Sequence, residues 1–390
     1  MNIVIIGNGA AGALTAGHLR KALPEANIHI ISDENYCFYS RPRIIDYLTG
    51  TIEKEKLIIR KEDWYKKNQI ELYLEQKVIS INPSEKCVIL EDTRCFHYDT
   101  LVIAAGAHSF LPNFNCTTEG IFTLRTIDDA DCIINYSKGR KKASVIGGGL
   151  LGIEAGHSLL NRGLEVEIIE CFDRLLPRQL DPESASILQG QLEQKGLQFR
   201  LGMQTQKIVP DEKGFDILFK DGQKTATELI LVSAGIRPNL SIIKDSGIES
   251  NKGITVNEYL QTNYEDIYAC GDIAEFNGTI YGIWPAANEQ ASVVAKNIAG
   301  MKQVYKGTVM STKLKVAGIN LVSIGEVSEE NGAVGQSSGD GSDFKKLFFR
   351  DDKLTGAILI GDTKAFTSYQ RAILEGADRK VVENMGVKSA

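Results

Sequence analysis

The sequence predicts an α/β fold with two similar units, in each of which a helix joins parallel strands, and a smaller α+β region near the C-terminus. Two observations carry this prediction. Short β-branched runs lead directly into a GxGxxG glycine pattern at two places, 7–12 and 147–152. Residues 305–390 instead predict short strands at 313–322, 345–350 and 354–360, a Gly/Ser-rich loop at 331–342 and a hairpin at 348–356, which is typical of a β-rich region.

The first unit begins at the N-terminus. The continuous apolar run 2–6 predicts a strand buried on both faces, 13–20 has a helical pattern, and 27–31 predicts a second strand. Between strand and helix, glycine permits a tight turn and close approach of the backbone to a pyrophosphate, while the helix N-terminus offers N–H groups to the anion. The unit is therefore expected to be Rossmann-like and to bind a dinucleotide.

The second unit repeats this order, with strand 142–146, the glycine turn, a helix to about residue 162 and strand 165–169. Glu170 closes the last strand, where a carboxylate accepts from both ribose hydroxyls and repels a 2′-phosphate. NADH is thus favoured over NADPH. One GxGxxG is weak evidence, but two copies in the same strand–turn–helix–strand setting are strong.

The first unit departs from the ideal pattern at the end of its second strand. Ser32 stands where an acidic residue normally holds the adenosine ribose, and Asp33 follows one residue later. Either Asp33 reaches the ribose or the contact is weaker. Asp33 also fits a turn before Asn35.

Composition excludes several classes of protein. The chain has 390 residues, a net charge of −6 and an ordinary 43% of hydrophobic residues, which suggests no nucleic-acid partner. Its seven cysteines form no CxxC pair and its five histidines are scattered, so neither a local redox disulfide nor a metal site is expected. No apolar stretch approaches the roughly 18 residues of a membrane span and no signal peptide is evident, which predicts a cytoplasmic protein.

Three further segments resemble those of flavoprotein reductases that bind two dinucleotides. They are Tyr98-Asp-Thr-Leu-Val-Ile-Ala-Ala-Gly106, Leu231-Val-Ser-Ala-Gly-Ile-Arg-Pro-Asn239 and Ile267-Tyr-Ala-Cys-Gly-Asp-Ile-Ala274. The resemblance implies FAD in the first unit and NADH in the second. It implies a discontinuous FAD domain (1–112 and 236–304), an inserted NAD domain (113–235) and a C-terminal interface domain (305–390).

The resemblance also implies the site residues. Those expected at FAD are Gly7, Gly9, Ala10, Ala11, Gly12, Ser32, Asp33, Arg41, Val78, Ala105, Gly106, Arg125, Asp272, Trp284 and Lys315. Those expected at NAD are Gly147, Gly149, Leu150, Leu151, Gly152, Glu170 and Gly235.

Three of the expected roles have plainer alternatives. Glu154 matches a catalytic glutamate at the flavin–nicotinamide junction, although an acid in the first turn of a helix is favourable in any case. Arg41 is expected to place a positive charge near the flavin or its phosphates, but it also fits a solvated helix start. Lys315 equally fits a solvent-facing strand.

The segment 38–43 indicates which branch of these reductases the chain resembles. The redox cysteine of the disulfide-reducing branch falls on Arg41, and Cys37 lies four positions early, as a packing thiol. Phe38-Tyr-Ser-Arg-Pro-Arg43 resembles NADH:rubredoxin oxidoreductases. The segments 175–181 and 283–290 resemble both those enzymes and the flavoprotein part of assimilatory nitrite reductases, whose clustered iron–sulfur cysteines do not follow here.

We therefore expect a standalone FAD enzyme that passes electrons from NADH directly to a one-electron carrier such as rubredoxin. The alternatives are an NADH oxidase, a nitrite-reductase-type flavoprotein, or an NADH-sensing flavoprotein with slow turnover.

Overall fold

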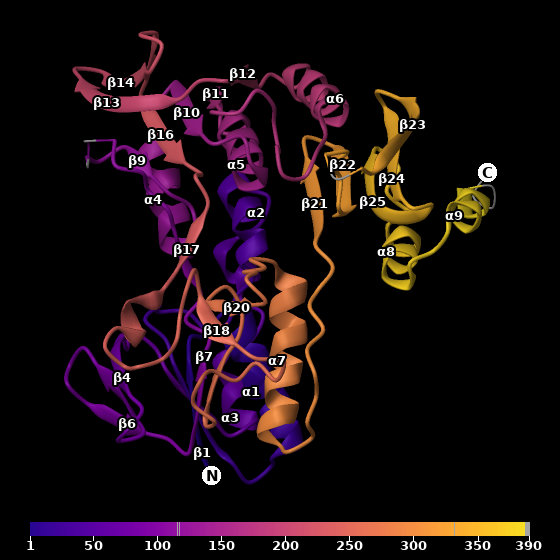
Figure 1. Ribbon diagram of the computed structural model, residues 1–390. Helices are drawn as coiled ribbons and strands as arrows, with labels where there is room; N and C mark the ends of the chain where they lie inside the picture. The colour runs from indigo at the N-terminus through magenta and orange to yellow at the C-terminus, as the bar shows by residue number, and fades with distance from the viewer. Residues whose placement is uncertain (115, 117, 331, 387–390) are drawn as a thin grey trace. The chain divides into compact units, whose positions relative to one another are not determined.

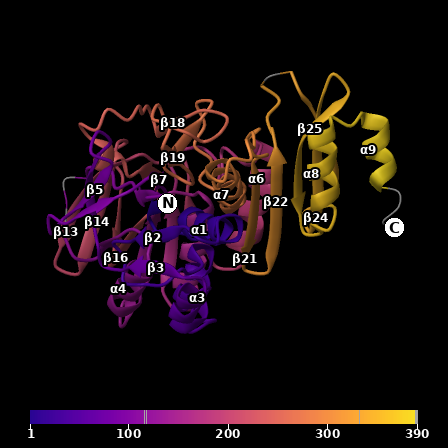
Figure 2. The ribbon, with the colours of Figure 1, turned by 90° about the horizontal axis from the view of Figure 1, so that it is seen from below.

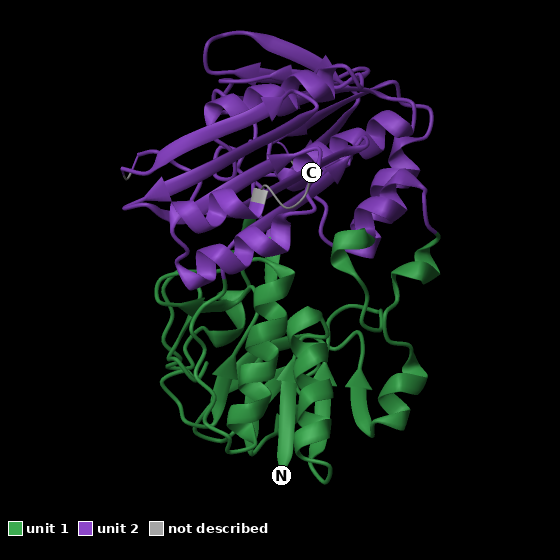
Figure 3. Ribbon diagram, turned by 90° about the vertical axis from the view of Figure 1, so that its right-hand side faces the viewer, with its two compact units in different colours: residues 1–43, 53–108, 236–308 green, residues 44–52, 109–235, 309–390 purple. Residues whose placement is uncertain are grey.

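The computed structural model describes residues 1–114, 116, 118–330 and 332–386. The chain divides into two compact units (Figure 3). Unit 1 comprises residues 1–43, 53–108 and 236–308, and unit 2 comprises 44–52, 109–235 and 309–390. The three-domain boundaries expected from the sequence stay a prediction.

A parallel five-stranded sheet forms the centre of unit 1, with its strands in the order β19-β7-β1-β2-β3. The strands are β1 (Asn2–Ile6), β2 (Asn27–Ile31), β3 (Ile70–Tyr73), β7 (Thr100–Ile103) and β19 (Ile267–Ala269). Helices α1 (Ala10–Ala22) and α7 (Trp284–Ile298) lie side by side (Figure 1). The central strands are buried on both faces, which explains their unbroken apolar runs.

Shorter elements complete unit 1. An antiparallel sheet contains β4 (Val78–Asn82), β5 (Cys87–Leu90) and β6 (Cys95–His97). The paired strands are β8 (Ala107–Ser109) with β17 (Ile236–Pro238), and β18 (Ile254–Val256) with β20 (Ala274–Phe276). The remaining helices are α3 (Glu62–Lys67) and the 3₁₀ turns η1 (Arg41–Arg43), η2 (Lys54–Leu57) and η3 (Leu240–Ile243).

Unit 2 contains a second parallel sheet, in the order β12-β11-β10-β16-β9. Its strands are β9 (Ile121–Phe122), β10 (Lys142–Ile146), β11 (Glu165–Ile169), β12 (Gln198–Arg200) and β16 (Leu229–Val232). Its helices are α2 (Ile44–Thr49), α4 (Ile127–Ser137), α5 (Leu150–Asn161) and α6 (Pro182–Glu193). An antiparallel sheet is formed by β13 (Thr205–Asp211), β14 (Gly214–Phe219) and β15 (Lys224–Thr227).

The C-terminal part of unit 2 is an antiparallel sheet in the order β21-β22-β25-β24-β23. Its strands are β21 (Ser311–Val316), β22 (Ile319–Gly325), β23 (Val334–Asp340), β24 (Asp343–Arg350) and β25 (Lys353–Ile360). Helices α8 (Phe366–Glu375) and α9 (Arg379–Gly386) follow, and α8 lies against this sheet (Figure 2). Tyr369 and Ala372 of α8 belong to the apolar core of this sheet.

Two sequence expectations for this sheet are wrong. Residues 313–322 were expected as one strand but form the β21–β22 hairpin, because Ala317 and Gly318 adopt positive φ and reverse the chain. The Gly/Ser-rich stretch 331–342 was expected as a loop, yet 334–340 is the edge strand β23. Its backbone pairs with β24 while its side chains are mostly exposed, so it has no apolar alternation.

The predicted α/β fold class, with two parallel sheets and a C-terminal α+β region, is confirmed. Across the described ranges, no helix is both long enough and apolar enough to cross a membrane.

Candidate functional site

The first glycine turn connects β1 to α1, and its three glycines differ in surroundings. Gly7 has a φ of +102°, and a Cβ there would overlap the backbone carbonyl of Ala104. A Cβ on Gly12 would overlap the carbonyl oxygen of Gly7, so this glycine sets the close packing of α1 on β1. A Cβ on Gly9 would instead meet nothing within 4 Å. Gly9 is the N-cap of α1 and gives it no side-chain cap, which leaves N–H groups available to an anion.

Asn8, inside this turn, is 7% exposed and fixes the turn to the segment that follows β2. Its Oδ1 accepts from the Tyr65 hydroxyl at 3.0 Å, and that hydroxyl oxygen accepts from the Phe38 N–H at 3.1 Å. Sequence reasoning missed Tyr65, because the GxGxxG pattern carries no signal for a partner on α3.

The end of β2 separates the two candidates for the FAD ribose. Ser32 is buried, and its Oγ accepts from the Glu34 N–H at 3.4 Å. Asp33 is exposed, and its carboxylate has no hydrogen-bond or ion-pair partner in the part of the chain that the structure describes. The structure thus leaves the Asp33 carboxylate available to a ligand, and its role stays a prediction.

Arg41, in η1, belongs to a charged group rather than to a solvated helix start. Its guanidinium forms an ion pair with Glu34 and donates to the Tyr39 hydroxyl at 2.9 Å. Burial opposes the positive charge, but Tyr39, Glu34 and Asp272 outweigh it and raise the pKa of Arg41. Two of the expected FAD residues, Arg41 and Asp272, are therefore electrostatic neighbours. Glu34 was missed because only the folded chain brings it to Arg41.

The loop carrying Asp272 lies against the first glycine turn. The Gly271 N–H donates to Oε1 of the buried Gln290 on α7 at 2.7 Å, and a Cβ on Gly271 would press on Ala11. Asp272 is thereby held beside the N-terminus of α1. At the start of α7, Trp284 stacks on Phe38 with ring centroids 5.7 Å apart. Val78, at the start of β4, is buried in the core of unit 1.

Asn239, directly after β17, is bonded to the residues directly before β8. Its Nδ2 donates to the Ala105 carbonyl at 2.8 Å, and its N–H donates to the Gly106 carbonyl at 3.1 Å. His108 donates from Nδ1 to Asn239 Oδ1 at 2.7 Å. These bonds fix the backbone of Ala105 and Gly106, the small residues expected at FAD.

The second glycine turn repeats the geometry of the first. Gly147 has a φ of +120°, and a Cβ there would overlap the Ser233 carbonyl. A Cβ on Gly152 would overlap the Gly147 carbonyl, whereas a Cβ on Gly149 would meet nothing within 4 Å. Gly149 is the N-cap of α5 and provides no side-chain cap, and Leu150 and Leu151 begin the helix.

Glu170, at the end of β11, is 7% exposed and turns back onto this glycine loop. Its Oε2 accepts from the Gly148 N–H at 2.6 Å, and its Oε1 accepts from the Phe172 N–H at 3.0 Å. The role of this carboxylate toward the adenosine ribose stays a prediction. The two backbone N–H groups also give it a structural role.

Glu154 lies just beyond the first turn of α5, which contains no acidic residue, and has an unusual environment for a carboxylate. Burial, and secondarily the Asp46 carboxylate on α2, raise its pKa to about 7. Its side chain has no hydrogen-bond partner among the described residues. A half-buried carboxyl group with a pKa near neutrality is typical of a functional site, because the burial of an ionisable side chain without a partner is otherwise uncommon in proteins.

Three remaining candidates lie elsewhere in unit 2. Arg125 directly precedes the Thr126 cap of α4, and its N–H donates to Asp129 Oδ2 at 2.8 Å. The Gly235 carbonyl accepts from the Phe110 N–H at 2.8 Å. Lys315 is exposed on β21. The expected roles of Arg125 and Lys315 toward FAD, and of Gly235 toward NAD, stay predictions.

All seven cysteines lie in the described ranges, and all are free thiols. Burial, with a smaller effect of Glu62, raises the pKa of Cys37. A raised pKa keeps the thiol protonated at neutral pH and therefore a poor nucleophile.

The two glycine turns fit two dinucleotides. In each, two glycines are required by backbone packing, while the third opens the uncapped helix N-terminus to an approaching pyrophosphate. This arrangement defines an oxidoreductase of the class that works with two dinucleotide cofactors.

Comparison with known proteins identifies the family. Residues 1–291 match the profile described as pyridine nucleotide-disulphide oxidoreductase, and residues 311–377 match that of the rubredoxin NAD⁺ reductase C-terminal domain. The chain belongs to the pyridine nucleotide-disulphide oxidoreductase family, whose members use FAD and NAD(H).

The relatives of the chain differ in their acceptors. The nitrite reductase [NAD(P)H] of Bacillus subtilis is 38% identical over 93% of this chain, which spans only 46% of that relative. The NADH-rubredoxin oxidoreductase of Clostridium acetobutylicum is 31% identical, with 95% of this chain and 94% of the relative covered. The crystal structure of NADH:rubredoxin oxidoreductase from the same organism superposes with a TM-score of 0.82 at 29% identity, covering 97% and 96% of the two chains.

Proposed function

We propose that the chain transfers electrons from NADH through FAD to a one-electron carrier such as rubredoxin, without a redox disulfide. The observation that carries the proposal is the ion pair of Arg41 with Glu34, at the position where disulfide-reducing relatives are expected to hold their thiol. The match of residues 311–377 to the rubredoxin reductase C-terminal domain supports the same acceptor.

In this proposal the first glycine turn, with Gly7, Gly9, Ala10, Ala11 and Gly12, holds the FAD pyrophosphate at the N-terminus of α1. When bound, FAD supplies the conversion of a hydride into single electrons. The Asp272 carboxylate accepts from a hydroxyl of the ribityl chain. Arg41, fixed by Glu34, contributes positive charge near the flavin or its phosphates.

The second turn, with Gly147, Gly149 and Gly152, holds the NADH pyrophosphate, and Glu170 accepts from the adenosine ribose hydroxyls. Glu154, on the same helix, orients the nicotinamide carboxamide. Since its pKa lies at about 7, Glu154 can present either a carboxylate or a carboxylic acid at neutral pH.

Steady-state NADH oxidation by the FAD-loaded protein tests the proposal. We expect turnover with oxidised rubredoxin and little with O₂ alone or with no acceptor. Cys37→Ser should leave carrier reduction unchanged, because the Cys37 thiol takes no part in it. Equal turnover with O₂ would instead indicate an NADH oxidase, and stoichiometric bleaching without turnover would indicate an NADH-sensing flavoprotein. Loss of turnover in Cys37→Ser would restore a thiol mechanism.

A second candidate is supported by the 38% identity to the Bacillus subtilis nitrite reductase over 93% of the chain. In that case the chain acts as a flavoprotein part that delivers electrons to a nitrite-reducing module. Rubredoxin would then be a poor acceptor, whereas an isolated nitrite-reducing module would support NADH oxidation and nitrite consumption.

A further inference from the structure

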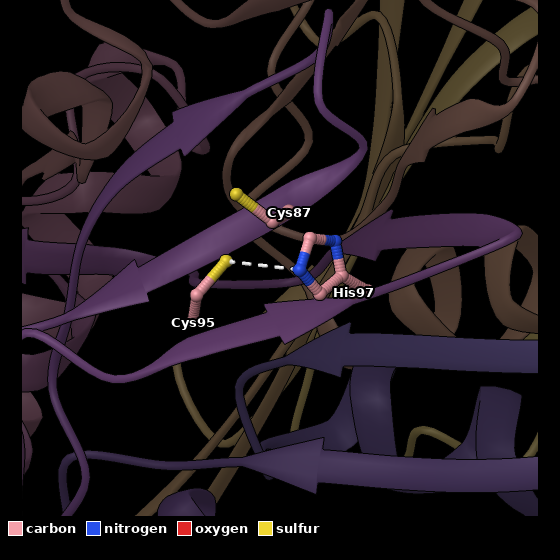
Figure 4. A group of neighbouring side chains, drawn as sticks. All are labelled: Cys87, Cys95 and His97. Carbon is pink, nitrogen blue, oxygen red and sulfur yellow. Dashed lines mark hydrogen bonds between the residues drawn. The ribbon is translucent and has the colours of Figure 1, made fainter.

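A face of the β5–β6 hairpin in unit 1 gathers three side chains that are good ligands for soft metals. Cys87 lies on β5, and Cys95 and His97 lie on β6 (Figure 4). One ligand atom from each residue, a sulfur or a ring nitrogen, lies within 4.8 Å of the other two, and Cys95 Sγ is 3.8 Å from His97 Nε2. None of the three belongs to the dinucleotide turns.

The register of the hairpin explains this grouping. Cys87 pairs with His97 across the antiparallel ladder, and Cys95 pairs with Ile89. Because side chains alternate along a strand, Cys95 and His97 point to the same face of β6, and Cys87 faces His97 from β5. A search of the sequence for CxxC pairs misses the grouping, since its members come from two strands.

The orientation of the His97 ring favours a metal. Its Nδ1 is 3.3 Å from the Glu85 backbone carbonyl, which can only accept, so Nδ1 carries the proton. Nε2 then presents a lone pair toward Cys95. An imidazole held by one nitrogen on a carbonyl, with the other nitrogen free for a metal, is the usual arrangement of histidine ligands.

We propose that Cys87, Cys95 and His97 form a binding site for a thiophilic divalent cation, with Zn²⁺ as the matching ion. Zinc takes sulfur at about 2.3 Å and imidazole nitrogen at about 2.0–2.1 Å in tetrahedral geometry. This geometry needs S···S and S···N separations of about 3.8 and 3.6 Å. The observed 3.8 Å, and the 4.8 Å limit on the others, require movements of about 1 Å or less. Water can take the fourth position.

A disulfide is a poorer use of the same thiols. Cys87 and Cys95 are diagonal neighbours in the ladder, and such positions are typically about 7–8 Å apart between Cα atoms. A disulfide spans about 4.4–6.8 Å, so closing one would require the strands to shift. A metal ion bridges the larger separation without this shift.

The three ligands also differ in exposure, which decides which variants are informative. Cys87 is 1% exposed, whereas Cys95 and His97 are exposed. The ion would therefore enter from the solvent side of the hairpin and hold β5 to β6. Substitution of Cys95 or His97 removes a ligand from the surface, with little effect on the packing of unit 1.

The experiment measures Zn²⁺ uptake by the full-length, FAD-loaded protein after its thiols have been reduced with a phosphine. Equilibrium dialysis followed by metal analysis gives the stoichiometry, and titration against a zinc-binding dye gives the affinity. We expect one Zn²⁺ per chain in the wild type. Affinity should fall at least tenfold in Cys95→Ser and in His97→Gln. Cys132→Ser, which removes an exposed thiol from α4, serves as the matched control and should bind as the wild type does.

Two results would overturn the proposal. One is zinc affinity that stays unchanged in both Cys95→Ser and His97→Gln, because the ion would then be bound elsewhere. The other is no zinc uptake by the reduced wild type, whether or not mass spectrometry finds a Cys87–Cys95 disulfide in the protein before reduction. Cys87→Ser is a supporting variant only, since its buried position can affect folding.

Discussion

Glu170 accepts hydrogen bonds from two backbone N–H groups, so a substitution there changes the glycine loop as well as the charge of the site. Glu170→Ala removes both acceptor atoms and lets the loop relax. Glu170→Gln is the sharper variant, because its amide oxygen can still accept from one N–H while the negative charge is gone. Comparing the two separates the loop from the electrostatic discrimination between nucleotides.

We expect Glu170→Gln to raise the ratio of kcat/KM for NADPH to that for NADH by on the order of tenfold, equal to about 1.4 kcal/mol. The reason is the loss of repulsion against the 2′-phosphate. Glu170→Ala should raise the same ratio and also weaken the binding of NADH. Steady-state kinetics with both nucleotides measures this, and a ratio unchanged in both variants would remove Glu170 from nucleotide selection.

The raised pKa of Glu154 predicts that the stability of the protein depends on pH. Its pKa is raised from 4.5 to about 7, so the native protein holds this proton over a range in which the unfolded chain has lost it. The free energy of unfolding therefore contains a term that falls as pH rises from 4.5 to about 7 and is constant above. The whole term is on the order of 3 kcal/mol.

Glu154→Gln should remove this term, so that the variant gains stability relative to the wild type as pH rises through that window. Urea unfolding of the FAD-loaded protein without NADH, at a series of pH values, measures the difference. Glu165→Gln, at an exposed position on β11, is the control and should follow the wild-type curve. Parallel curves for wild type and Glu154→Gln would contradict the raised pKa.

The sequence predicted the glycines that the backbone requires better than it predicted the contacts between side chains. Glycine patterns identify Gly7, Gly12 and Gly152 because the backbone itself requires them. Nothing in the sequence placed Glu34 on Arg41, since that contact forms between a loop and a 3₁₀ turn only after folding.

Within an element, the two kinds of turn glycine predict opposite effects of the same substitution. Gly12→Ala would drive a Cβ into the carbonyl of Gly7 and force α1 away from β1. Gly9 has a φ of −76°, which alanine adopts freely, and its Cβ would stand in open space. Alanine is therefore compatible with the fold at Gly9, but it occupies the position where the FAD pyrophosphate is expected.

We expect Gly9→Ala to fold with wild-type secondary structure and to lose FAD affinity by roughly a hundredfold, about 2.7 kcal/mol. Gly12→Ala should instead lower the unfolding temperature of the apoprotein. Circular dichroism and flavin fluorescence during FAD titration provide the two measurements. A Gly9→Ala protein that retains FAD normally would show that the pyrophosphate does not lie against this turn.

The strands and helices of the two βαβ units were predictable because each signal was local: an apolar run, a glycine turn and a helical repeat. The edge strand β23 was not, because its Gly and Ser side chains are exposed and carry no period-2 pattern. Its structure comes from the ladder hydrogen bonds with β24. The residues of β23 carry no signal for this pairing. The pairing of Cys87 with His97 across the β5–β6 hairpin was not predicted for the same reason.

At the scale of the whole of unit 2, a buried charged group joins the C-terminal sheet to the second dinucleotide region. Lys346 on β24 is 8% exposed and donates to Asp181 Oδ2 at 2.6 Å and to Glu183 Oε2 at 3.0 Å. Asp181 is also 8% exposed and caps α6 by accepting from the Ser184 N–H. Ser337 and Ser323 add hydrogen bonds to Glu183 and to the Gln179 carbonyl.

Burial opposes the charge of Asp181, but the hydrogen bonds from Lys346 and Ser184 and the charge of Lys346 together outweigh it and lower the pKa of the carboxyl. The pair therefore contributes stability above the ordinary carboxyl pKa of 3.8, and that stability is lost as pH falls through the lowered value. Removing only the lysine leaves a buried carboxylate without a cation, which typically costs about 3–5 kcal/mol.

We expect Lys346→Met to destabilise unit 2 by this amount and to expose the C-terminal sheet to limited proteolysis. Adding Asp181→Asn should recover much of the loss, because asparagine keeps the cap of α6 while removing the stranded charge. Lys345→Met, one residue away on the opposite face of β24, controls for the loss of a lysine. Urea unfolding measures the loss of stability, and limited tryptic digestion of the native proteins measures the exposure of the C-terminal sheet. If Lys346→Met is as stable as Lys345→Met, the ion pair does not hold the sheet to α6, and the apolar contacts suffice.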